Sequence, residues 1–149
     1  MPSYGTTRLY RPDPASASES KRYGRGMFSV RHPAGARIRV AASGEIDAVN
    51  GRALGTFVER HTGISKQLIV DLRAVDFFGT QGFTALYYIS VHCTRSDVDW
   101  MLVGGPPVRR ILQICDPDGE LPFVEDLQAA VGWLDHLAQL HPDKASSVG

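Results

Sequence analysis

One stretch, KQLIVDL at residues 66–72, constrains the fold more than any other part of the sequence. It is nearly unbroken in apolar residues and has the length of a strand. Such a run is typical of a central strand that is buried on both faces of its sheet. The chain has 149 residues, of which 43% are hydrophobic, so it is long enough for one globular domain built around that strand.

Shorter strand-like segments precede and follow this run. Residues 27–30 and 37–42 favour strands and flank the Pro/Gly turn HPAGA, which predicts a hairpin. Residues 98–105 predict a further strand that ends at a glycine pair, and residues 121–125 predict a last short strand.

Apolar residues at helical spacing predict four helices between and after these strands. Asp47 is the expected N-cap of the first helix and Gly63 its expected stop. Pro106 or Pro107 is expected to start the third helix. The four apolar stripes are Leu54, Phe57, Val58 and His61; Phe83, Leu86, Ile89 and Cys93; Val108, Ile111, Leu112 and Cys115; and Leu127, Val131, Leu134 and Ala138.

The predicted order of elements is β-β-α-β-α-β-α-(β)-α. This alternation predicts an α/β fold, with four to five strands in the sheet and about four helices packed on it. Residues 27–140 form the single predicted domain. Residues 1–26 and 141–149 are expected to be disordered tails, because they have few apolar residues that would favour ordering.

Charge is unevenly distributed, although the formal net charge is zero. Residues 1–37 carry seven Arg or Lys against two acidic residues, so the N-terminal tail is basic. We expect a solvated tail, with contact to nucleic acid or an acidic partner as the alternative. Aromatic residues are too sparse there for base stacking, so no direct nucleic-acid binding is predicted.

No stretch reaches the about 18–20 apolar residues that a membrane span needs, and no secretory signal is evident. We therefore expect a cytoplasmic protein without a membrane contact.

The segment DFFGTQGF, residues 76–83, places Thr80 between two glycines at the predicted start of the second helix. Thr80 could act as a nucleophile with His136 and either Asp116 or Asp118, but Phe78 stands where a nucleophile elbow has glycine. The Gly-x-x-Gly turn could cradle a phosphate, although the P-loop and dinucleotide fingerprints are absent. Thirdly, the Thr80 hydroxyl could cap the helix.

The two cysteines, Cys93 and Cys115, both fall on apolar helix stripes, which favours a packing role. A redox pair between them is the alternative. The five histidines lack the spacing of metal ligands. No set of residues supplies an acid, a base and an oxyanion site together. We therefore expect no metal, no cofactor and no enzymatic activity.

Three motifs in this order carry further information. Gly44-Glu45-Ile46-Asp47 follows a strand, residues 68–86 run from the apolar strand through DFFGTQGF, and Val108–Leu112 reads V-R-R-I-L. Together they resemble the STAS domain of bacterial anti-sigma-factor antagonists over about residues 27–138. The resemblance implies a STAS-like mixed sheet.

The same resemblance implies a partner-switching role. Members of that family bind an anti-sigma factor that is also a serine/threonine kinase, and thereby release a sigma factor. The kinase phosphorylates the hydroxyl residue that follows Asp in a D-S-S-G motif, and a phosphatase reverses this. The matching position is Thr80. Gly79 and Gln81 replace the family's Asp and second Ser, whereas Gly82 is retained.

We therefore expect an anti-sigma factor of the kinase type, and a phosphatase, as partners. The expected contact face combines the exposed side of the helix that starts at Thr80 with Gly44, Glu45, Asp47, Phe77, Phe78, Gly79, Gln81 and Gly82. The alternative is a sensor that binds a nucleotide-like ligand near Gly79–Gly82 or responds to redox through Cys93 and Cys115.

Overall fold

Strand β4, Gln67–Phe78, lies between β3 and β5 inside a six-stranded sheet. The computed structural model describes residues 19–34 and 36–142. The strands follow the sequence order across the sheet. The other strands are β1 (Glu19–Tyr23), β2 (Gly26–Ala34), β3 (Arg37–Ile46), β5 (Asp99–Gly104) and β6 (Phe123–Val124).

The sheet is mixed. The pairs β1–β2 and β2–β3 are antiparallel, and the pairs β3–β4, β4–β5 and β5–β6 are parallel. The predicted hairpin, the central strand and the last short strand are confirmed. The α/β class is confirmed as well, but the sheet has one strand more than the four to five expected.

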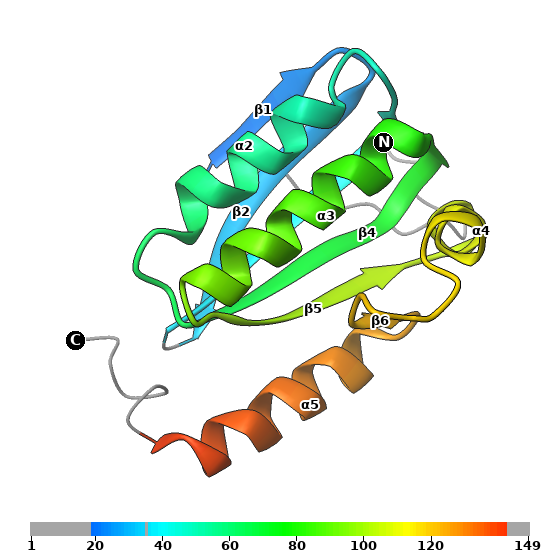
Figure 1. Ribbon diagram of the computed structural model, residues 1–149. Helices are drawn as coiled ribbons and strands as arrows, with labels where there is room; N and C mark the ends of the chain where they lie inside the picture. The colour runs from blue at the N-terminus through cyan, green and yellow to red at the C-terminus, as the bar shows by residue number, and fades with distance from the viewer. Residues whose placement is uncertain (1–18, 35, 143–149) are drawn as a thin grey trace, which may run out of the picture.

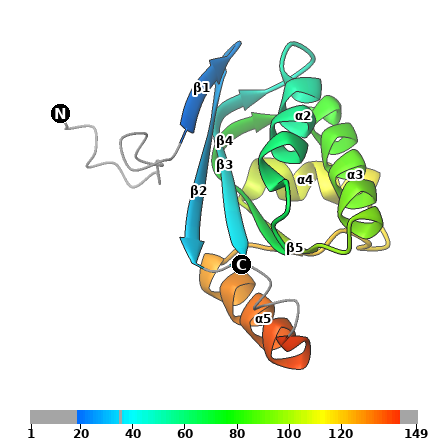
Figure 2. The same cartoon turned by 90° about the vertical axis from the view of Figure 1, so that its left-hand side faces the viewer.

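Within the described residues, four helices flank the sheet: α2 (Gly51–Thr62), α3 (Thr80–Arg95), α4 (Pro106–Cys115) and α5 (Leu127–Leu140). Helices α2 and α3 run side by side across one face (Figure 1). Figure 2 shows α2, α3 and α4 together on that side of the sheet. Helix α5 packs on the other face, where Ala130 and Leu134 contact Ile69, Met101 and Val103. Strand β4 is thus buried on both faces, as predicted.

Two polar side chains within β4 are buried with partners. Arg73 donates from Nε and Nη2 to Asp71 at 2.9 and 2.8 Å, which compensates the buried carboxylate. Gln67 accepts from Nη2 of Arg37 at 2.8 Å and donates from Nε2 to the carbonyl oxygen of Leu134 at 2.8 Å. This network joins β3, β4 and α5.

The expectation of disorder is wrong for residues 19–26. They form β1, a turn and the start of β2. Tyr23 stacks on Phe28 with ring centroids 4.8 Å apart, and Glu19 pairs with Arg60 of α2 at 3.1 Å. These tertiary contacts stabilise a strand whose own sequence, ESKRY, shows no apolar periodicity. The other parts of the expected tails, residues 1–18 and 143–149, lie outside the described residues.

Two predicted helix caps are wrong. The N-cap of α2 is Asn50, and Asp47 lies three residues earlier, where its carboxylate accepts from the backbone N–H of Val49 at 2.9 Å. The N-cap of α3 is Gly79, so Thr80 is the first helical residue and its hydroxyl does not cap the helix. Gly63, with φ of 50°, does end α2 as predicted.

Asn50 is buried and ties three segments together. Its Nδ2 donates to the carbonyl oxygens of Tyr23 and Glu45 at 2.9 and 2.8 Å, and its Oδ1 accepts from the backbone N–H of Asp47 at 2.9 Å. It therefore fixes the loop between β3 and α2 against the turn between β1 and β2.

Glycine at position 82 allows α3 to approach the end of β4. A Cβ atom there would lie 2.5 Å from ring carbons of Phe78, which is itself only 4% exposed. The Phe78 ring thus packs directly on the first turn of α3.

This packing predicts opposite effects for two glycine-to-alanine changes. Gly82→Ala should destabilise the fold by about 1–3 kcal/mol, because the added methyl overpacks against Phe78. The control is Gly132→Ala on α5, where an added Cβ would meet nothing within 4 Å. This variant should stabilise the fold by about 0.5–1 kcal/mol, because alanine favours a helix over glycine. Urea unfolding measures both. Equal effects for the two variants would contradict the described contact.

Candidate functional site

The parallel pairing of β3 with β4 brings two predicted contact segments to one edge of the sheet. Glu45 pairs with Phe77 and Ile46 with Phe78, although the segments are about thirty residues apart in sequence. The backbone N–H of Gly79 donates to the carbonyl oxygen of Ile46 at 2.9 Å. We call residues 44–47 and 77–82 together the carboxyl edge.

The first segment of the carboxyl edge has a constrained backbone. Gly44 has φ of 85°, and a Cβ there would lie 2.3 Å from the carbonyl oxygen of Arg25, so only glycine fits. The backbone N–H of Glu45 donates to that same oxygen at 3.1 Å. The side chains of Glu45 and Asp47 are half-buried.

The second segment exposes some of the predicted residues and buries others. Phe77 is 51% exposed, and Thr80 and Gln81 are exposed on the first turn of α3. Phe78 and Gly82 are buried against each other and act as packing residues. The predicted set is therefore gathered at one place, but Phe78 and Gly82 do not offer side-chain surface to a partner.

Thr80 is well placed to be modified. It is an exposed hydroxyl residue at the N-terminus of a helix of 16 residues, whose first turn contains no acidic residue. The positive end of a helix dipole favours negative charge. A phosphate on Thr80 would therefore be tolerated by α3 itself.

The geometry does not support Thr80 as a nucleophile with the partners expected. His136 lies on α5, which packs on the opposite face of the sheet from α3, and it contacts Trp133. Asp116 is occupied as an acceptor from the backbone N–H groups of Glu120 and Leu121, both at 2.9 Å.

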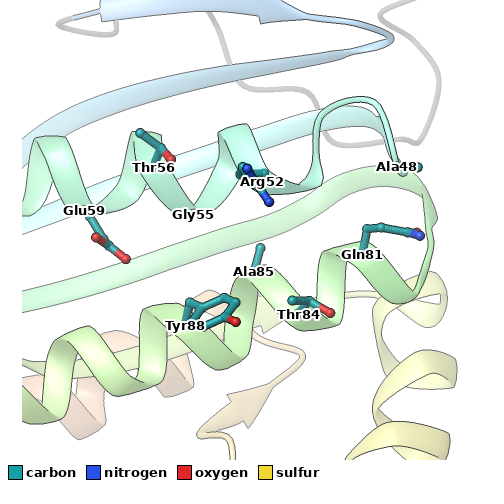
Figure 3. Close-up of a pocket in the computed structure, with 9 residues that line it drawn as sticks. All are labelled: Ala48, Arg52, Gly55, Thr56, Glu59, Gln81, Thr84, Ala85 and Tyr88. Atoms are coloured by element: carbon teal, nitrogen blue, oxygen red, sulfur yellow. The ribbon is translucent and has the colours of Figure 1, made fainter.

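A groove of about 550 Å³ runs between α2 and α3, next to the carboxyl edge. Gln81 belongs to both, and Figure 3 shows it at one end of the groove. The sequence placed the exposed side of α3 in the contact face but did not predict the groove, because its other wall comes from α2, about thirty residues earlier in the chain. The lining residues are Ala48, Arg52, Gly55, Thr56, Glu59, Gln81, Thr84, Ala85 and Tyr88.

Both cysteines are free thiols. Cys93 is buried in the main core, and burial, assisted by the negative charge of Glu59, raises its pKa to about 12. A thiol that stays protonated at neutral pH is a poor nucleophile for disulfide exchange. Packing is thus the role that the structure favours for Cys93.

Comparison with protein-family models identifies the family to which this fold belongs. The model of the STAS domain matches residues 28–130. The chain belongs to the STAS domain family. This assignment confirms the resemblance on which the expected fold rests.

Solved structures agree with this assignment. An anti-sigma factor antagonist from Mycobacterium paratuberculosis has 25% sequence identity and a TM-score of 0.61, covering 72% of this chain and 92% of that one. The anti-sigma factor antagonist SpoIIAA, in its unphosphorylated form, has 13% identity and a TM-score of 0.59, covering 75% of this chain and 96% of that one. Curated protein sequences gave no significant match.

Membrane-spanning helices and metal-binding groups were sought among the residues that the structure describes. Within residues 19–34 and 36–142, no helix is both long and apolar enough to cross a bilayer. The same residues contain no group of three His, Cys, Asp or Glu side chains placed to hold a metal ion.

The raised pKa of Cys93 predicts a specific loss of stability in alkali. The unfolded thiol ionises near pH 9, whereas the folded thiol holds its proton up to about pH 12. Stability is therefore unaffected by this group below pH 9 and falls as the pH rises above it. Between pH 8 and 10.5, the wild-type protein should lose on the order of 1–2 kcal/mol more than Cys93→Ala does.

The measurement is urea unfolding at both pH values, with Cys115→Ala as the control. This variant keeps the buried Cys93 thiol, so it should still show the alkaline loss of stability. Identical pH slopes for the wild type and Cys93→Ala would contradict a buried, protonated thiol.

Proposed function

We propose that this STAS protein is a non-catalytic anti-sigma-factor antagonist. It binds an anti-sigma factor of the serine/threonine kinase type through the carboxyl edge and thereby controls sigma-factor-dependent transcription indirectly. Family membership and the likeness to two anti-sigma factor antagonists support the proposal. The cytoplasmic location expected from the sequence is part of it.

One observation carries the proposal beyond family membership. The only hydroxyl-bearing residue of the carboxyl edge, Thr80, is exposed there and lies on the same edge as the Gly44–Asp47 turn. A partner that covers this edge therefore covers Thr80 as well.

Phosphorylation of Thr80 would then act as a local electrostatic switch. It adds about −1.5 to −2 charges at neutral pH. In free solution, water and the N-terminus of α3 stabilise that charge. Beneath a partner, the phosphate loses its hydration without gaining a compensating cation, so binding weakens. A phosphatase would restore the binding-competent form.

The neighbours of Thr80 differ from the family motif in a way that matters for this switch. Gly79 replaces an acidic residue, so the unmodified segment carries less negative charge. Phosphate is consequently a larger relative change in charge here than next to a carboxylate. The kinase must also recognise this segment without an acidic residue directly before Thr80.

The test is a titration of candidate anti-sigma kinases with the wild type, Thr80→Ala and Thr80→Glu. The first two should bind alike. Thr80→Glu should bind at least tenfold more weakly, a loss of about 1.4 kcal/mol or more. Its thermal stability should not fall, because a carboxylate in the first turn of α3 is favoured by the helix dipole.

Thr94→Glu is the matched control, since Thr94 is an exposed threonine at the opposite end of α3. It should leave the affinity unchanged. Equal binding by the wild type, Thr80→Glu and Thr94→Glu would reject Thr80 as the switch. Failure of any anti-sigma kinase to bind the wild type would reject the proposed function itself.

A further inference from the structure

The groove between α2 and α3 carries opposite charges at separate points along one helix. Arg52 and Glu59 are the two charged residues among those that line it, and both belong to α2. They are seven residues apart, which is two helical turns or about 10 Å along the axis. In Figure 3, Glu59 points from α2 toward α3, and Arg52 is drawn over α2 on the near side of the groove. Within the part of the chain that the structure describes, neither has an ion-pair partner.

Gly55 lies at the floor of the groove, and the packing of α2 on α3 does not require glycine at this position. Gly55 lies inside α2, and a Cβ there would meet Ala85 of α3 at an ordinary contact distance of 3.9 Å. Alanine would therefore fit and would favour the helix. By contrast, Gly51 is required, since its Cβ would approach the Cβ of Gln81 to 2.8 Å. Glycine at position 55 keeps the floor of the groove open.

The walls suit a protein segment better than an enclosed small molecule. Arg52, Glu59, Thr84 and Tyr88 are all exposed, whereas small ligands are mostly surrounded by their pockets. Tyr88 also forms an edge-on pair with Tyr87, with ring centroids 5.8 Å apart. Tyrosine and arginine are enriched where protein interfaces bind most strongly. An open groove between two helices is the surface on which an amphipathic helix docks.

We propose that this groove receives an amphipathic helix of the protein partner. That helix places an acidic side chain against Arg52 and a basic side chain, two turns away, against Glu59. Small apolar side chains between them pack on Gly55 and Ala85. The inference rests on the proposed function, in that the helix belongs to the partner that covers the carboxyl edge.

The first test uses the partner that binds the wild type. Arg52→Glu and Gly55→Leu should each weaken its affinity at least tenfold, since one reverses a charge contact and the other fills the floor. Their matched controls are Arg95→Glu, an exposed arginine at the far end of α3, and Gly132→Leu, a glycine of α5 with open space around it. The controls should change affinity less than twofold, and unfolding curves should show all four variants folded.

A second test does not depend on the anti-sigma partner. A displayed library of random 16-residue peptides is selected against the full chain and against Glu59→Arg. The wild type should enrich helical peptides with an acidic and a basic residue seven positions apart. Glu59→Arg presents two cations and should instead enrich two acidic residues at that spacing.

The two tests separate the possible failures. If the kinase binds the wild type, Arg52→Glu and Gly55→Leu with equal affinity, the groove inference is overturned and the proposed function stands. Peptide selection with the expected charge spacing, without binding of any kinase, supports the groove and rejects the anti-sigma role. Peptides with no common charge spacing, or the same peptides from both proteins, overturn the inference.

Discussion

The parallel pairing of β3 with β4 is the constraint on which the rest of the structure depends. It aligns Ile46 with Phe78 and lets the backbone N–H of Gly79 donate to Ile46 at 2.9 Å. Both helices that form the groove begin just after these strands end, so their first turns meet, with Gly51 against Gln81. The carboxyl edge and the groove are therefore two parts of one surface, positioned by the same pair of strands.

Much of this arrangement follows from sequence patterns with a direct physical cause. The apolar run at residues 66–72 must be covered on both sides, which fixes the central strand and the layers around it. Helical stripes and the glycine at position 63 locate the helices. Alternating strands and helices then imply parallel strands, whose carboxyl ends meet at one edge. The family resemblance implied that residues 44–47 and 77–82 belong to one contact face, and the parallel pairing of β3 with β4 explains why these segments lie together.

The errors have an equally physical origin. Strand β1 is polar, and it is held by contacts that only the folded protein supplies, such as Tyr23 on Phe28. The role of Asn50 depends on carbonyl oxygens from two distant segments, so sequence spacing favoured Asp47 as the cap instead. Phe78 and Gly82 sit inside a motif that suggests binding, but the close contact between ring and helix makes them packing residues.

Within the carboxyl edge, the residues that stabilise the fold differ from those that are exposed to a partner. Buried members of the carboxyl edge hold its shape, while Phe77, Thr80 and Gln81 face solvent. A switch needs this combination, because a charge added to an exposed residue on a rigid edge alters binding without unfolding the protein. The groove continues the same surface along α2 and α3, and in the proposed complex the charges of Arg52 and Glu59 add selectivity to it.

Hydrogen–deuterium exchange of the full chain, with and without the bound anti-sigma factor, would locate the surface that the partner covers. We expect new protection at residues 44–47 and 77–82 and along the facing sides of α2 and α3, with α5 unchanged. Protection confined to α5, or to the face of the sheet on which it packs, would contradict it.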